Sequence, residues 1–194
     1  ERMLTLIHRT LETNSDKLSL EEAHQLAKKT ADESVVLLEN DGVLPLNDTQ
    51  KVLFVGPFAK HPRYQGGGSS HINAYRVVGA LEAVENSELN VSFVEGFSLN
   101  EQDDKKLHEE AVEQSKDADV VVVFAGLPDE YESEGYDRKH LNLPETQNQL
   151  IQKLVDAGRR VVVVLHNGSP VLLPWRNEVA ALLEVYLGGE AVGE

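Results

Sequence analysis

The sequence predicts an α/β protein, a three-layer α/β/α sandwich with a mostly parallel sheet of about five or six strands. Strand-like runs rich in Val and Phe alternate with segments of helical pattern, which is typical of parallel strands joined by right-handed crossovers. Two runs, Asp119–Ala125 and Arg160–His166, are nearly unbroken apolar stretches, as expected for strands covered by helices on both faces. The 194 residues are 41% hydrophobic, enough for one core, so we expect a single domain over 1–194.

The N-terminal segment, residues 1–18, is polar with scattered apolar positions, and we expect it to be a linker or a peripheral helix. Within it, Thr13–Asp16 has the composition of a turn. Ser19 and Glu22 match the capping box, in which each side chain satisfies the other residue's free backbone donor. The pair predicts a helix from about Leu20.

The helix after Ser19 is expected to end near Asn40-Asp41-Gly42, a strong turn signal. Its apolar spacing predicts that four of its positions face inward: Ala23, Leu26, Ala27 and Val35.

Strands and helices then alternate to the end of the chain. The expected strands are Lys51–Gly56, Val91–Glu95, Asp119–Ala125, Arg160–His166 and, as a fifth, Ala180–Leu187. The expected helices are Arg76–Glu85, Glu101–Lys116 and Pro144–Ala157.

Composition limits the partners and the chemistry. The formal net charge of −15 disfavours nucleic acid and anionic lipid, and no apolar run approaches a membrane span. Neutral partners such as sugars remain compatible with such a surface. The chain has no Cys and no metal-binding His spacing, so we expect no metal and no cofactor. The lack of Cys suits a reducing compartment, and we expect the cytoplasm.

The segment Glu132–Arg138 is the main candidate for chemistry, because it follows the buried run Asp119–Gly126. In an open parallel sheet, loops at the carboxyl ends of the strands meet ligands. Glu132 and Glu134 are both candidate proton donors, and Gly135 frees the backbone to present Glu134. A solvated acidic loop is the plainer interpretation of these charges.

Other residues of this loop have supporting roles. Tyr136 can stack on a ring, and Asp137 and Arg138 are expected to pair and brace the loop.

A second loop, Gly66-Gly67-Gly68-Ser69-Ser70, follows the first of the parallel strands, on the edge where Glu134 is expected. Three glycines permit positive φ and a close backbone approach. A phosphate-binding loop is disfavoured, since neither G-x-x-x-x-G-K-[ST] nor G-x-G-x-x-G is present. A flexible loop without function remains open.

Two further residues allow two interpretations each. His166, at a strand end, is either a ligand or base or, as we expect, a hydrogen-bonded structural residue. Trp175 packs either in the core or against the sheet edge.

An ordered set of segments resembles the family 3 glycoside hydrolases, chiefly the β-glucosidases, in their C-terminal α/β sandwich domain. The resemblance covers residues from about 20 to 194, with the ordered set highly specific although each motif is modest alone. The matching segments are Glu33–Leu46, Val55–Pro57, Gly66–Ser70, Gly126–Pro128, Glu132–Arg138, Leu143-Pro144, Gly168–Val171, Pro174-Trp175 and Tyr186–Ala191.

The resemblance implies a retaining, exo-acting β-glycosidase whose site lies between an N-terminal (β/α)8 barrel and this sandwich. The barrel would supply an Asp nucleophile from a Ser-Asp-Trp type motif, which this chain lacks. The sandwich would supply the general acid/base, assigned to Glu134 because relatives commonly carry Ser-Gly-Glu-Gly-Tyr, with Glu132 in reserve. The substrate would be a β-glucoside or oligosaccharide, and this chain alone, which has the look of a piece of a longer polypeptide, would be inactive.

A second hypothesis comes from a different class. Some relatives take their acid/base from the barrel, and their sandwich only supports the barrel and contacts sugar. The presence of Glu132–Arg138 favours the catalytic hypothesis. A nucleotide-binding Rossmann domain ranks third, because its phosphate loop and following acidic residue are absent.

Overall fold

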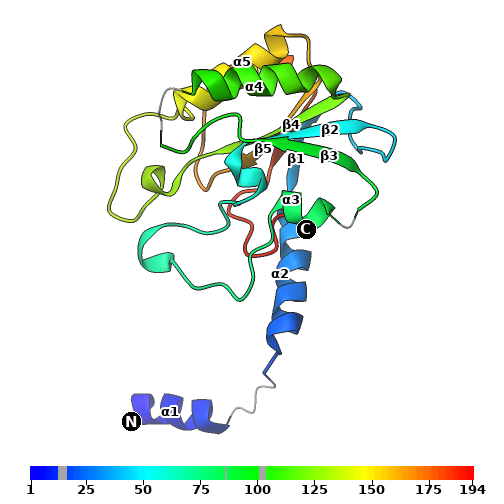
Figure 1. The fold of residues 1–194 in the computed structure, drawn as a ribbon. Helices are drawn as coiled ribbons and strands as arrows, with labels where there is room; N and C mark the ends of the chain where they lie inside the picture. The colour runs from blue at the N-terminus through cyan, green and yellow to red at the C-terminus, as the bar shows by residue number, and fades with distance from the viewer. Residues whose placement is uncertain (13–16, 86, 101–103) are drawn as a thin grey trace.

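The computed structural model describes residues 1–12, 17–85, 87–100 and 104–194, which form a six-stranded sheet with helices on both faces (Figure 1). The strand order is β1-β6-β5-β4-β2-β3, and only the β1–β6 pair is antiparallel. The predicted mostly parallel α/β sandwich is confirmed. The strands are β1 (Val36–Asn40), β2 (Lys51–Val55), β3 (Asn90–Val94), β4 (Val120–Gly126), β5 (Val161–His166) and β6 (Ala181–Glu184).

The helices differ in length from the predicted ones. The segment expected at Arg76–Glu85 is helical only over its last part, and residues 101–103 of another expected helix lie outside the described residues. The α-helices are α1 (Arg2–Glu12), α2 (Leu20–Ser34), α3 (Ala80–Val84), α4 (Lys105–Gln114) and α5 (Glu145–Asp156).

The core lies in two layers, one on each face of the sheet. Because side chains alternate along a strand, Val121 and Val123 of β4 pack on one face, together with α4 and α5. Val120 and Val122 pack on the other face, against α3 and the segment after β1. All seven residues of β4 are buried, as its unbroken apolar run predicted.

The capping box of α2 is confirmed, but the predicted end of this helix is wrong. The Ser19 hydroxyl accepts a hydrogen bond from the Glu22 N–H at 3.2 Å, and the Glu22 carboxylate accepts one from the Ser19 N–H at 2.8 Å. The helix ends at Ser34, and β1 begins two residues later. Val36 and its neighbours leave the helix because they form the antiparallel edge pair with β6.

The predicted inward positions of this segment are also largely wrong. Ala23, Leu26 and Val35 are exposed and Ala27 is half-buried, whereas the buried residues of α2 are His24 and Ala31. His24 is buried because it lies between two carboxylates near the C-terminus, contacts that a helical apolar pattern does not reveal.

The segment 1–18 contains α1, none of whose residues is buried, and the turn expected at Thr13–Asp16 lies outside the described residues. None of the helices described by the structure combines the length and the hydropathy needed to cross a membrane.

The sheet topology creates one favoured position for a site. From β2 the chain moves outward to β3, then returns to place β4 on the other side of β2, and continues through β5 to β6. The strand order therefore reverses between β2 and β4. Loops that leave the carboxyl ends of such a pair diverge, and ligands of open α/β sheets bind in the crevice between them. These are the loops that carry Gly66–Ser70 and Glu132–Arg138.

Candidate active site

Glu134 lies at the reversal point, on the loop after β4, and contacts the loop after β2. Its carboxylate Oε2 accepts a hydrogen bond from the Ser69 N–H at 2.9 Å. The Glu134 residue is exposed, and the Ser69 bond ties it to the opposite loop. The structure thus brings together the two loops that the sequence placed on one edge.

Two of the three glycines, Gly67 and Gly68, pack against the loop that carries Glu134. A Cβ on Gly68 would lie 2.6 Å from Glu134 Cβ, and Gly68 has φ +81, a left-handed conformation. A Cβ on Gly67 would lie 3.3 Å from the Ser133 hydroxyl oxygen. Gly67 and Gly68 therefore permit close packing of one loop on the other.

Hydrogen bonding holds the charged form of Glu134. The Ser69 hydroxyl and then the Ser69 backbone N–H lower the pKa of the Glu134 carboxyl, and slight desolvation opposes them. In this chain Glu134 is therefore ionised at neutral pH.

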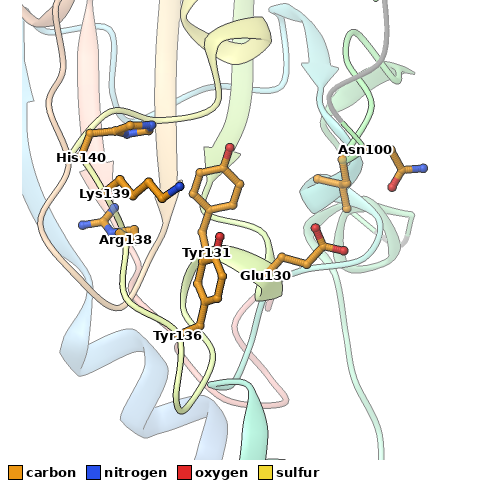
Figure 2. A pocket seen from close by; sticks show the side chains of 8 residues that line it. Asn100, Glu130, Tyr131, Tyr136, Arg138, Lys139 and His140 are labelled. Atoms are coloured by element: carbon orange, nitrogen blue, oxygen red, sulfur yellow. The ribbon is translucent and has the colours of Figure 1, made fainter.

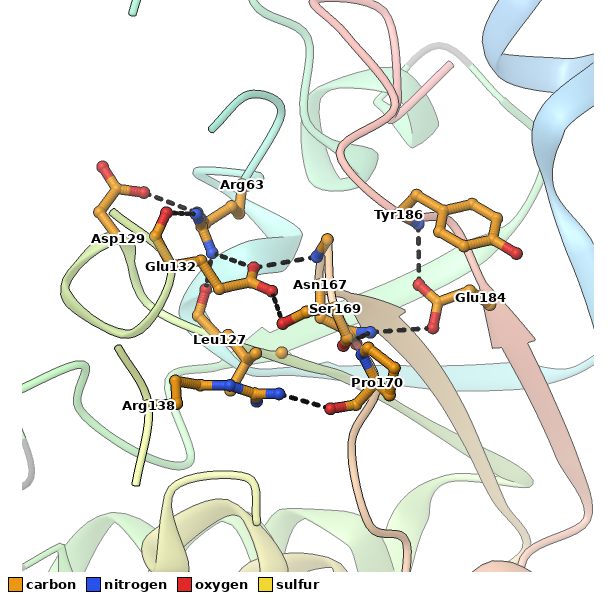
Figure 3. A network of polar contacts seen from close by, with 12 residues as sticks. Arg63, Leu127, Asp129, Glu132, Arg138, Asn167, Ser169, Pro170, Glu184 and Tyr186 are labelled. Atoms are coloured by element: carbon orange, nitrogen blue, oxygen red, sulfur yellow. Dashed lines mark hydrogen bonds and ion pairs between the residues drawn. The ribbon is translucent and has the colours of Figure 1, made fainter. Parts of the chain in front are cut away.

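Glu132 occupies a different environment although it lies only two positions earlier. Its Oε2 accepts hydrogen bonds from Arg63 Nη1 at 2.8 Å and from the Gly168 N–H at 2.9 Å, and its Oε1 accepts one from the Ser169 hydroxyl (Figure 3). The side chain is only 10% exposed. Both oxygens are thus engaged inside the protein.

Arg63 completes this cluster from the loop after β2. The side chain is 2% exposed and also contacts the carboxylate of Asp129 at 2.7 Å and donates to the Leu127 carbonyl. A buried guanidinium requires such partners, because an unpaired buried charge is costly.

Arg138 does not form the expected pair with Asp137 in the described part of the chain. Its Nη2 donates instead to the carbonyl oxygen of Pro170 at 2.6 Å, so it braces the Glu132–Arg138 loop against the loop after β5. The expected Asp137–Arg138 pair is therefore wrong for the described residues, and Arg138 bonds to Pro170 instead.

A hollow of about 300 Å³ adjoins the same loop. Figure 2 shows the rings of Tyr131 and Tyr136 at its centre, with Arg138 and Lys139 beside them. Tyr136 is 60% exposed, so its ring face is open to a ligand. The other residues that line the hollow are Leu99, Asn100, Glu130 and His140.

Most of the chain matches a known family. The model of the glycosyl hydrolase family 3 C-terminal domain matches residues 35–194. The chain belongs to glycosyl hydrolase family 3.

Family 3 relatives match nearly the whole of this chain. It is 45% identical over 200 residues to thermostable beta-glucosidase B of Acetivibrio thermocellus, which covers 100% of this chain and 26% of the relative. It is 38% identical to an exo-alpha-(1->6)-L-arabinopyranosidase of Bifidobacterium longum, and the match covers 98% of this chain and 27% of that relative. The chain therefore spans about a quarter of the length of these curated relatives.

Solved family 3 structures have the same fold. The crystal structure of a beta-glucosidase from Bifidobacterium adolescentis superposes with a TM-score of 0.90 at 37% identity, covering 98% of this chain and 29% of that one. The crystal structure of a beta-glucosidase from Listeria innocua in complex with isofagomine superposes with a TM-score of 0.78 at 28% identity. This match covers 94% of this chain and 26% of that one.

Two other residues singled out in this family 3 chain, Trp175 and His166, are buried. Trp175 is fully buried in the core, and its Nε1 donates to Asn148 Oδ1 at 2.9 Å. His166 is buried near the rings of Phe58 and Phe124. Burial lowers the pKa of His166 to about 4, with the nearby Arg63 backbone opposing, so the ring is neutral at pH 7.

The expected hydrogen bonding of His166 is not found, since neither ring nitrogen has a partner at hydrogen-bonding distance within the described residues. Among those residues, no group of three or more His, Asp or Glu side chains is arranged to hold a metal ion.

The sequence alone did not reveal the contacts of Arg63 in this candidate site. The residue stands alone in a polar segment, and its acidic partners lie 66 and 69 positions further along the chain. The available signal was indirect: Glu132, Gly168 and Ser169 all belong to segments that resemble the family, which indicates a shared structural role.

Proposed function

We propose that this chain is the acid/base domain of a retaining, exo-acting β-glycosidase, and that Glu134 is its general acid/base. The observation that carries the proposal is the position of the Glu134 carboxylate: it is exposed and held by Ser69 where the loops after β2 and β4 meet. The crevice outside that edge is the expected place for a ligand.

The chemistry needs two carboxyl groups. A nucleophilic carboxylate attacks the anomeric carbon while a protonated carboxyl, roughly 5–5.5 Å away, protonates the departing oxygen. Glu134 would give its proton to that oxygen, and its carboxylate would then remove a proton from the water that hydrolyses the glycosyl-enzyme. The nucleophile would come from an N-terminal (β/α)8 barrel of the same polypeptide.

Glu134 is a better candidate than Glu132 on structural grounds. A general acid must reach the substrate oxygen with a free carboxyl oxygen. Both oxygens of Glu132 accept hydrogen bonds from within the protein, whereas Oε1 of Glu134 lies on an exposed side chain.

A proton donor must be protonated when substrate arrives, but hydrogen bonds from Ser69 lower the pKa of Glu134 in this chain. Burial against the barrel and the charge of the nucleophile would raise that pKa in the complete enzyme. The chain by itself has neither partner, so we propose that it is inactive alone.

The substrate class follows from the relatives. The relatives that match include a beta-glucosidase and an exo-alpha-(1->6)-L-arabinopyranosidase, both named for acting on glycosides. We propose a terminal, non-reducing β-linked sugar as the substrate, with a β-glucoside as the first choice. The exposed ring of Tyr136, two residues after Glu134 on the same loop, offers a stacking surface for the leaving group.

The test is Glu134→Ala in the full-length enzyme. Hydrolysis of alkyl glycosides should fall steeply, because their leaving groups need a proton. Dinitrophenyl glycosides leave without one and should still form the glycosyl-enzyme. Added azide should restore turnover and yield a β-glycosyl azide, since the carboxylate that would repel it is gone.

Two results would contradict the assignment. If Glu132→Ala shows this pattern and Glu134→Ala does not, the acid/base is Glu132. If neither variant shows it, the domain is a non-catalytic module that supports the barrel and contacts sugar.

A further inference from the structure

We infer that Glu132 is a positioning residue, which fixes Glu134 for proton transfer by joining the loops that follow β2, β4 and β5. This inference rests on the proposed function of Glu134. Glu134 itself is exposed, and among the described residues its polar contacts are with Ser69.

The carboxylate of Glu132 lies where three loops meet. Arg63 comes from the loop after β2, Glu132 from the loop after β4, and Gly168 and Ser169 from the loop after β5 (Figure 3). Nothing else in the described chain connects all three loops through one side chain. Removal of this carboxylate would take its acceptor from the Gly168 N–H and its buried carboxylate partner from Arg63 at the same time, leaving Arg63 with Asp129 and backbone carbonyls.

Charge makes this junction strong. Arg63 is 2% exposed and Glu132 10% exposed, so their 2.8 Å ion pair is shielded from water. Arg63 also contacts Asp129, which is 69% exposed and therefore holds the guanidinium less firmly. The buried partner of Arg63 is Glu132.

The junction acts on Glu134 because there is almost no chain between them. One residue, Ser133, separates the two, and two residues span at most about 7 Å. Ser133 itself packs on Gly67. A shift of Glu132 must therefore move Glu134 relative to Ser69, and a displacement of about 1 Å can slow a positioned reaction by about 100-fold.

A purely structural role makes a different prediction. Loss of folded protein lowers the rate on every substrate by one common factor. Misplacement of Glu134 lowers only the rate of the step that needs its proton. The dependence of the loss on the leaving group therefore separates the two.

The experiment compares Glu132→Gln with wild type in the full-length enzyme, on an alkyl and a dinitrophenyl glycoside of the same sugar. Glutamine keeps the shape of the side chain. It has no negative charge and only one oxygen to accept hydrogen bonds from Arg63, Gly168 and Ser169. We expect kcat/KM for the alkyl glycoside to fall about 10- to 100-fold. For the dinitrophenyl glycoside, kcat/KM should stay within about twofold, because its glycosylation step needs no proton.

A matched control and a milder variant accompany it. Glu145→Gln makes the same change at an exposed position at the start of α5 and should leave both rates unchanged. Ser169→Ala removes one hydrogen bond to Glu132 and should show the same leaving-group dependence at smaller size, even if Glu132→Gln folds poorly.

The outcomes separate this inference from the proposed function. Equal losses on both substrates, in Glu132→Gln and in Ser169→Ala, would overturn the positioning role while leaving Glu134 as acid/base. Strong azide rescue of Glu132→Gln would also overturn it, because the Glu134 carboxylate that repels azide would then not be the catalytic one. Failure of Glu134→Ala to show the acid/base pattern would remove the proposed function itself.

Discussion

Gly68 packs so closely on Glu134 that a Cβ at position 68 would lie 2.6 Å from Glu134 Cβ. Two loops from neighbouring strands thus meet at a point where no side chain fits. The contact makes the glycine a steric requirement for the position of the carboxylate.

Gly68→Ala should therefore impair acid catalysis in the full-length enzyme. The added methyl group must push the Glu134 segment away, and alanine at φ +81 is strained by roughly 1–2 kcal/mol as well. Gly158→Ala is the control, since Gly158 has φ +72 with open space around it. Both variants should lose stability in thermal unfolding, but only Gly68→Ala should lose alkyl-glycoside hydrolysis. Equal activity in the two would show that the contact does not matter.

The carboxyl of Glu134 should titrate below its ordinary value in this chain. The Ser69 hydroxyl and backbone N–H favour the ionised form and lower the pKa from 4.5. Carbon-detected NMR titration of the isolated chain measures this directly. Ser69→Ala removes the hydroxyl and should raise the pKa of Glu134, whereas Ser70→Ala should not. A pKa of Glu134 at or above 4.5 in the unchanged chain would contradict the expected bonding.

Stability should depend on pH through His24. Its ring lies between the carboxylates of Glu190 at 2.8 Å and Glu194 at 2.7 Å. The hydrogen bonds that the His24 ring donates to Glu194 and then to Glu190 raise the pKa of His24 above 6.5, and the same bond to Glu194 lowers the pKa of Glu194 below 4.5. Because the pKa of His24 is higher in the folded protein, its ring stabilises the fold fully below the pKa of the unfolded state. This stabilisation is lost as pH rises through the pKa of the folded state.

At low pH, the stabilisation by the His24 contact is limited by protonation of Glu194. Its lowered pKa means that the stabilisation disappears as pH falls through the pKa of Glu194 in the folded protein.

The unfolding midpoint of wild type should exceed that of His24→Gln more at about pH 6 than at about pH 9. His8→Gln, at a histidine whose side chain is 75% exposed, should show no such trend. A constant difference for His24→Gln would refute the charged contact.

Gln147 should be needed to close the end of β4. Its side-chain amide donates to the Gly126 carbonyl and accepts from the Gly126 N–H, both at 2.9 Å, in a buried setting. Gln147→Leu leaves two buried backbone groups without partners and should cost about 2–4 kcal/mol of unfolding free energy. Gln149→Leu, at an exposed position of the same helix, should be nearly neutral. Urea unfolding of both variants measures the difference.

Much of the fold was predictable because its signals are local. The apolar run of β4 and the capping box at Ser19 and Glu22 each depend on a few adjacent residues. β1 was not predictable in this way, since Val36–Asn40 continues an apolar helical pattern. Its strand conformation depends on pairing with Ala181–Glu184, far along the chain.

The candidate site shows the same difference between contacts that local patterns predict and contacts that they do not. Sheet-edge reasoning placed Glu134 beside the triple glycine, because strand order and the loops that follow the strands are enough to decide it. The Arg63–Glu132 ion pair depends on the paths of two long loops, which no local pattern specifies. The bonding of Arg138 to Pro170, in place of Asp137, has the same origin.

The segment after β2 holds both glutamates of the segment after β4: Arg63 contacts Glu132, and Ser69 with Gly68 contacts Glu134. Between these contacts each backbone path has a fixed number of residues. A single insertion or deletion at 64–67, or at Ser133, would leave one contact out of register with the other. Length variation among homologous chains is therefore expected outside these stretches, even where the amino acids within them differ.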